Sequence, residues 1–169
     1  VRELRMAKED FKFHHPIRVR WSECDLQAIV YNAVYLTWTE VAFSEYCRHL
    51  GFNLYRLAQL NLFDTVTATI TIDYKSPARL DDVVDVYTRV ANIGNTSIGI
   101  EFELYRHGYE QLLSRVEGVY VSYDSSEGHP RRVPNAIRQV FEHFEETKTK
   151  LSLEQFPIFA SALNETAPD

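Results

Sequence analysis

The sequence predicts an α+β domain in which an antiparallel sheet wraps around one long buried helix. Two observations predict this arrangement. A mostly apolar helical stretch occupies residues 32–50, and segments with the period of a β-strand lie on both sides of it. The expected strands are residues 12–21, a strand from Thr65 that ends before Pro77, and residues 83–93, 97–105 and 111–123.

Residues 12–21 are expected to form a strand that is buried on one face. Ile17, Val19 and Trp21 alternate there with arginines. A period of two is the pattern of a strand with one face against a core. A loop then leads into the helical stretch.

Apolar side chains surround most of the helical stretch 32–50. They are Val34, Leu36, Trp38, Val41, Phe43, Tyr46 and Leu50. A helix that is apolar nearly all round is normally enclosed by the protein. Gly51 follows, and a glycine just past the last turn commonly ends a helix.

The strands after the helix are expected to be antiparallel neighbours. From Thr65 onward, valine, alanine and isoleucine alternate with threonine, a β-branched pattern with little competition from helix. The later strands are joined by short turns at Gly94-Asn95 and at residues 107–109. Connections of this length require antiparallel hairpins, so we predict a meander.

A surface helix is expected to close the domain. Pro134 precedes apolar residues with helical spacing, namely Ile137, Val140, Phe141 and Phe144. All 169 residues fit one domain with a core at about 12–145. Residues 151–169 are expected to form a tail that contains apolar residues and ends in a disordered NETAPD segment.

Composition excludes several classes of function. Lys and Arg total 18 against 24 Asp and Glu, and the net charge of −6 gives no electrostatic reason to bind nucleic acid or an anionic membrane. No apolar run approaches the ~20 residues of a membrane span. Cys24 and Cys47 are too few for a disulfide framework, so we expect reduced thiols in a cytoplasmic protein.

No metal or other cofactor is expected. Neither cysteine has a partner at the spacing of a metal finger. His14 and His15 are adjacent on a predicted strand, so their side chains point to opposite faces and do not share one ion.

Asp25 and Asn32 carry the chemistry that the sequence suggests. Asp25 lies in the loop before the helix, and Asn32 opens the helix. A helix start offers unpaired N–H groups and roughly half a positive charge, which suits a developing oxyanion. A carboxylate beside it favours hydrolysis of an activated acyl compound. The simpler alternatives are a loop-capping role for Asp25 and an N-cap role for Asn32.

The residues around the helix start resemble a known family. They are Asp25, Val30, Tyr31, Asn32, Tyr35, Leu36 and Glu40, followed by the Ser76-Pro77-Ala78-Arg79-Leu80 turn with Asp82. This pattern is similar to the 4-hydroxybenzoyl-CoA thioesterase-like branch of the hotdog-fold acyl-CoA thioesterases. The resemblance implies a hotdog fold and hydrolysis of an acyl-CoA thioester to a carboxylic acid and CoA.

The resemblance also implies roles for individual residues. Asp25 would attack the thioester carbonyl or activate the attacking water, and the Asn32 N–H would bind the oxyanion. Glu40 would support the site by orienting water, or it would bond to backbone or solvent. Tyr31, Tyr35 and Trp38 are the candidates for substrate contact, although aromatic residues at helical spacing are more often core.

The partners implied by the resemblance are an acyl-CoA substrate and a second copy of the chain, as a homodimer or homotetramer. The turn at residues 93–96, where some relatives carry basic residues for the CoA phosphates, is uncharged here. Arg89, Arg106 or Arg115 could serve instead. Two alternatives remain open, an acyl-carrier-protein thioesterase and a non-catalytic acyl-CoA-binding protein.

Overall fold

The computed structural model describes residues 8–163 of the chain. Its helices and strands in chain order are β1 (Phe13–Arg18), α1 (Val34–His49), α2 (Leu54–Gln59), β2 (Thr65–Tyr74), β3 (Val83–Ile93), β4 (Ser97–Arg106), β5 (Leu112–Asp124), β6 (His129–Pro130), α3 (Asn135–Thr147) and α4 (Pro157–Leu163). Short 3-10 turns add residues 8–10, 21–23 and 153–155.

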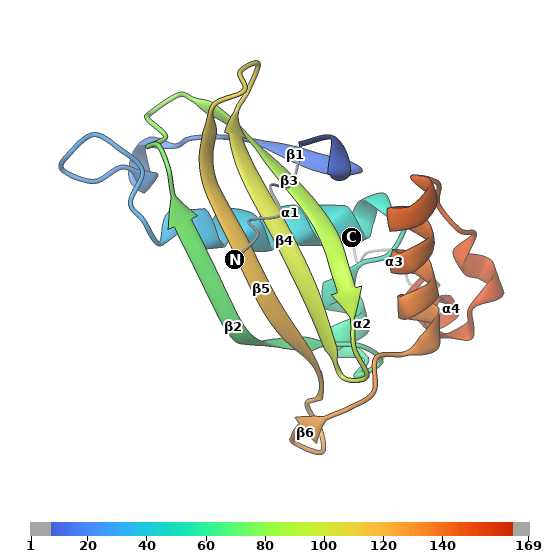
Figure 1. The fold of residues 1–169 in the computed structure, drawn as a ribbon. Helices are drawn as coiled ribbons and strands as arrows, with labels where there is room; N and C mark the ends of the chain where they lie inside the picture. The colour runs from blue at the N-terminus through green and yellow to red at the C-terminus, as the bar shows by residue number, and fades with distance from the viewer. Residues whose placement is uncertain (1–7, 164–169) are drawn as a thin grey trace, which may run out of the picture.

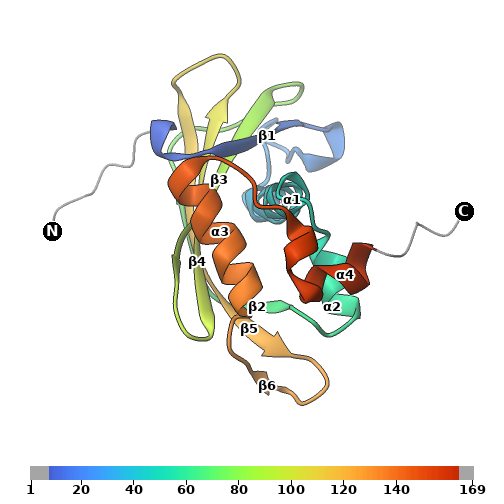
Figure 2. The same ribbon diagram turned by 90° about the vertical axis from the view of Figure 1, so that its right-hand side faces the viewer.

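An antiparallel sheet curls around α1, as the sequence predicts. The strand order is β1-β3-β4-β5-β2, and β6 pairs with β5. Figure 1 shows α1 crossing behind the sheet, and Figure 2, which looks along α1, shows the strands bending around one side of it. The core fills the space between the inner face of the sheet and this helix.

The prediction of a simple meander is wrong for β2. Only β3, β4 and β5 follow one another across the sheet, and β2 pairs with β5 at the far edge. The connection at residues 75–82 can reach roughly 25 Å when extended. Crossing three strand spacings requires only about 14 Å. The chain can therefore pass across the end of the curled sheet before β3 begins.

The two edges of the sheet differ. β1 is short and contains Pro16, which has no N–H to donate. β2 is longer, contains no proline and exposes Val66 and Ala68. The predicted burial of Trp21 is wrong, because the chain leaves the strand after Arg18 and turns at residues 21–23, so Trp21 is 83% exposed.

α1 begins two residues later than predicted and is buried on only one face. Its first residue is Val34, and Gly51 ends it with a φ of 103°, as the sequence predicts. The opposite face exposes Thr37, Glu40 and Val41. The helix is therefore not enclosed all round within a single chain, because the sheet covers one side alone.

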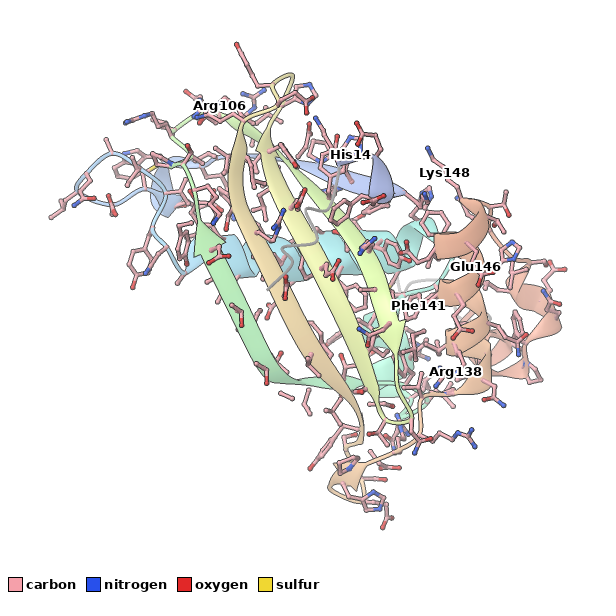
Figure 3. All side chains as sticks on the ribbon, in the orientation of Figure 1. His14, Arg106, Arg138, Phe141, Glu146 and Lys148 are labelled. Carbon is pink, nitrogen blue, oxygen red and sulfur yellow. The ribbon has the colours of Figure 1, made fainter. Side chains whose placement is uncertain are left out.

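The C-terminal end of α1 is closed by aromatic packing. Tyr46 contacts Phe141 and Phe144 of α3 at ring-centroid distances of 5.8 and 5.5 Å, and Figure 3 shows Phe141 on the side of α3 facing the sheet. The Tyr46 hydroxyl donates to Glu145 at 2.6 Å. Phe159 of α4 is fully buried, so the segment after α3 adds to the core.

The sequence also predicts a disordered NETAPD segment and no membrane span. The NETAPD segment lies outside the described residues. Among residues 8–163, no helix combines the length and apolar character needed to cross a bilayer.

Candidate active site

A hollow of about 480 Å³ opens at the N-terminal end of α1. Its lining comes from the loop before α1 and from the end of β2 with the turn that follows. The lining residues are Asp25, Gln27, Ile29, Val30, Tyr31, Asn32, Tyr35, Tyr74, Lys75, Ser76 and Pro77. Figure 1 shows this loop projecting beyond the sheet beside the end of β2. The fold therefore brings Asp25, Tyr31, Asn32 and Tyr35 to one place, as the sequence predicts.

Backbone hydrogen bonds hold the loop before α1 in shape. Asp25 N donates to Ile29 O, and Val30 N donates to Ala78 O, both at 2.9 Å. Tyr31 N donates to Glu23 O, also at 2.9 Å. The loop is thus tied to itself and to the turn after β2.

Glu23 forms the base of this loop. Its side chain is buried, and one carboxylate oxygen accepts from the Arg20 guanidinium at 2.6 Å and from the Trp38 indole N–H at 3.1 Å. Burial alone would raise the pKa of this carboxyl, but the hydrogen bonds and charge of Arg20 and the Trp38 donor outweigh it. The pKa of Glu23 therefore lies below its usual value.

Asp25 presents a carboxylate at the rim of the hollow. The side chain is exposed, and its Oδ1 accepts from the backbone N–H of Gln27 at 2.7 Å. The other oxygen has no hydrogen-bond partner among residues 8–163. One oxygen of Asp25 therefore caps the loop, while the other is left without a partner in the described part of the chain.

Asn32 lies in a turn immediately before α1. Val34 N donates to Tyr31 O at 3.0 Å, and no side chain caps the helix start. The N–H groups of Asn32 and Ala33 donate to no group within residues 8–163. In a trans peptide the C=O and N–H point in opposite directions. Because Tyr31 O points toward Val34, the Asn32 N–H points back, away from the helix.

Three tyrosines surround this turn. Tyr31 is 55% exposed on the rim, whereas the buried Tyr35 accepts from Ala78 N at 2.9 Å. Tyr74 donates its hydroxyl proton to Asn32 O at 2.8 Å. Burial and the neighbouring Tyr31 raise the pKa of Tyr74, so its hydroxyl stays protonated at neutral pH.

Tyr74 was missed by the sequence analysis. It is separated from Asn32 by 42 positions in the chain. The sequence feature that could have pointed to Tyr74 is its position at the end of the alternating strand, directly before the Lys75-Ser76-Pro77 turn. Its partner could not be read from that position without the pairing of β2 with β5.

Two predicted residues lie elsewhere. Within the described chain, Trp38 does not line this hollow, and its indole lies in the core against Glu23 and Tyr35. Glu40 is exposed on α1 and lines a different hollow that includes Tyr55 and Tyr120. A single chain therefore does not bring Glu40 to Asp25.

The arginines considered for the CoA phosphates are all paired. Arg89 contacts Glu101 at 2.8 Å, and Arg115 contacts Glu103 at 2.5 Å. Arg106 contacts Asp82 at 2.7 Å near the connection between β2 and β3, where Figure 3 labels it. Lys75 is the basic residue that lines the hollow, and its ammonium group lies 3.8 Å from an Asp73 carboxylate oxygen.

Burial argues against Cys47 as a nucleophile. Cys24 and Cys47 form no disulfide with each other, and burial raises the pKa of the Cys47 thiol. Within residues 8–163, no group of three or more His, Cys, Asp or Glu side chains is arranged to hold a metal ion.

Comparison with known proteins decides the family. The model of the thioesterase-like superfamily matches residues 19–141, which include the whole loop, α1 and the sheet from β2 to β5. The chain belongs to this superfamily. The class of enzyme expected from the sequence, a thioester hydrolase, is thereby confirmed.

Individual relatives agree with this assignment. The acyl-CoA thioesterase YbgC of Haemophilus influenzae is 31% identical over 134 residues, which cover 79% of this chain and 97% of the relative. A thioesterase from Thermus thermophilus, solved with coenzyme A and Zn, matches with a TM-score of 0.71 and 27% identity, covering 82% of this chain and 97% of that one. These likenesses confirm the hotdog fold.

A more distant relative differs in the carrier of its acyl group. The acyl-acyl carrier protein thioesterase ATL3 of Arabidopsis thaliana is 25% identical over 143 residues, covering 84% of this chain and 74% of the relative. Membership of the superfamily therefore leaves the choice between CoA and carrier protein to be tested.

Proposed function

We propose that this chain hydrolyses an acyl-CoA thioester to a carboxylic acid and CoA in the hollow at the start of α1. The observation that carries the proposal is that Asp25 and Asn32 line one hollow, with a carboxylate oxygen and an N–H group that have no partner within residues 8–163. The named YbgC relative and the CoA-bound Thermus thioesterase support CoA as the carrier.

The proposed chemistry assigns one task to each group. The Asn32 N–H donates to the carbonyl oxygen as it gains negative charge, and the start of α1 adds its positive end. Asp25 either accepts a proton from water, whose oxygen forms the new C–O bond, or attacks the carbonyl itself and forms a mixed anhydride, which water then hydrolyses to the free acid and the restored Asp25 carboxylate. The C–S bond then breaks, and the CoA thiolate leaves and takes up a proton.

The free oxygen of Asp25 is tested by substitution. In Asp25→Asn the amide keeps an acceptor for Gln27 N but loses its basicity and most of its nucleophilicity. We expect kcat for a panel of acyl-CoA substrates to fall roughly 100-fold or more, because a base or nucleophile is removed. Equal turnover by both proteins would exclude Asp25 from the reaction.

The Asn32 N–H is tested by a matched pair of variants. Asn32→Pro removes the N–H, and proline is well tolerated at the second position of a turn such as Tyr31–Val34. Asn32→Ala removes the side chain and keeps the N–H. We expect a loss in kcat of about 100-fold or more for the proline variant alone. A similar loss in both variants would assign the effect to the side chain instead.

The acyl-carrier-protein alternative is favoured by the Arabidopsis relative. Both carriers present the same phosphopantetheine thioester, so the chemistry is shared and the recognition differs. Comparing kcat/KM for one acyl group on CoA and on carrier protein distinguishes them. A higher value on carrier protein would reassign the substrate and leave the roles of Asp25 and Asn32 intact.

The proposed assembly is a homodimer that uses the open side of the single chain. The exposed face of α1 with Val41 and the unpaired edge at β2 with Val66 and Ala68 offer apolar surface and free backbone groups. Such an assembly gives Glu40 a second subunit as neighbour. Light scattering after size-exclusion chromatography measures the mass, and a monomer at micromolar concentration would contradict the proposal.

A further inference from the structure

We propose that Tyr74 is a positioning residue for thioester hydrolysis, because its hydroxyl holds the turn that carries the oxyanion-binding N–H. The inference rests on the proposed function. Tyr74 lines the same hollow as Asp25 and Asn32 but comes from the end of β2, whereas those two residues come from the segment before α1.

The contact acts on the backbone at Asn32. The Tyr74 hydroxyl donates to Asn32 O at 2.8 Å, and within residues 8–163 no other group donates to that carbonyl. The peptide on the other side of Asn32 is fixed by the bond from Val34 N to Tyr31 O. The two bonds together hold both peptides that flank the Asn32 Cα. The direction of the Asn32 N–H is therefore set by one bond within the turn and one bond from the sheet.

Tyr74 is itself held by the sheet. It is the last residue of β2 and pairs with Ser114 of β5. Directly after it, Lys75 N and Ser76 N both donate to Leu113 O, at 2.9 and 3.1 Å. An anchor on a paired strand is more rigid than one on a loop. The sheet therefore holds, through Tyr74, the turn that carries the Asn32 N–H in a fixed position.

Tyr74 is 47% exposed, but its ring also has one aromatic contact. It meets the ring of Tyr35 edge-on at 5.4 Å and 87°, and Tyr35 is in turn fixed by its bond to Ala78 N. Removing the hydroxyl alone therefore leaves the ring in place. Tyr74→Phe is consequently a clean deletion of one hydrogen bond.

The closing experiment compares kinetics of the parent with Tyr74→Phe on one acyl-CoA substrate. We expect kcat to fall about 3- to 10-fold, the equivalent of one neutral hydrogen bond, while KM stays unchanged. A thioether analogue of the substrate lacks the carbonyl oxygen, so its affinity should be the same for both proteins. Thermal melting establishes that each protein is folded at the assay temperature.

The matched control is Tyr109→Phe. Tyr109 is exposed in the turn between β4 and β5, away from the hollow. We expect this variant to have the kcat of the parent. The control removes a hydroxyl of the same kind from the same fold, so any loss specific to Tyr74 belongs to its position.

Each outcome has a separate meaning. If the parent hydrolyses the thioester and Tyr74→Phe has the same kcat, the positioning role is overturned and the proposed function stands. A rise in KM together with weaker binding of the thioether analogue would also overturn it, since the hydroxyl would then contact bound substrate. If the parent hydrolyses no acyl thioester, the proposed function itself fails.

Discussion

The two ends of α1 have opposite construction. At the C-terminal end, Tyr46, Phe141 and Phe144 form a closed aromatic cluster beneath α3. At the N-terminal end, Tyr31 is exposed and Asn32 keeps an unpartnered N–H, within residues 8–163, at the edge of a hollow. The closed end contributes burial, and the open end leaves backbone donors and a carboxylate without partners within residues 8–163. Under the proposed function, stability and chemistry are therefore separated along one helix.

The largest expected effect on stability is at the closed end. Phe141 is fully buried and contacts Phe43, Tyr46 and Phe52. We expect Phe141→Ala to lower the free energy of unfolding by about 3–5 kcal/mol through lost burial and a cavity. Denaturant unfolding measures this. At a temperature where the variant is folded, its kcat should equal that of the parent. A loss of kcat in the folded variant would contradict the idea that the closed end serves stability alone.

A smaller effect is expected at Glu23, which links the loop before α1 to the N-terminal half of the helix. Its buried carboxylate joins the loop to Trp38 of α1. We expect Glu23→Gln to lower the free energy of unfolding by about 1–3 kcal/mol. An amide N–H₂, which is a donor, replaces a carboxylate oxygen that accepts a hydrogen bond from a charged guanidinium. Turnover should fall as well, since Tyr31 N donates to the backbone of this residue. Full activity at unchanged stability would show that the loop does not depend on this carboxylate.

The same carboxylate predicts a pH dependence. The pKa of Glu23 is lowered in the folded protein below the usual value for a glutamate. A lowered pKa means that the folded state binds fewer protons, so the stabilisation is complete above the unfolded pKa and is lost as pH falls through the folded pKa. The stability difference between parent and Glu23→Gln should therefore shrink in acid. Unfolding curves at neutral and acidic pH test this, and a difference that grows in acid would contradict it.

The smallest effect is expected for Tyr31 at the open end. Its side chain is exposed and lines the hollow. We expect Tyr31→Ala to raise KM a few-fold, because about 1 kcal/mol of substrate binding free energy is lost. The melting temperature should not change. Tyr55→Ala, which changes an exposed tyrosine outside this hollow, is the matched control. A large drop in melting temperature for Tyr31→Ala would show that this side chain supports the fold rather than the substrate.

Local patterns predicted the elements because local physics determines them. The turns at Gly94-Asn95 and residues 107–109 are too short for anything other than hairpins, and the structure has β3, β4 and β5 in that order. Gly51 ends α1 as its position suggests. Asp25 and Asn32 could be placed together because only a short loop separates them.

What the sequence did not predict depends on contacts between distant segments. The bond from Tyr74 to Asn32 requires β2 to lie beside β5, and no local period encodes that pairing. The direction of Glu40 depends on which face of α1 the sheet covers, and a nearly uniform apolar pattern does not specify it. The prediction for Trp21 failed because the strand ended earlier than its alternation implied.

The proline in β1 has a consequence for how many chains can join. A sheet with two open edges can add copies without limit, as in a fibril. Here Pro16 removes a backbone donor from one edge strand, whereas β2, the other edge strand within residues 8–163, is longer and contains no proline. In the proposed homodimer, two copies pair through their β2 strands, and each copy then covers the longer edge of the other. Under this proposal strand addition stops at a pair, which is a closed assembly with a twofold axis.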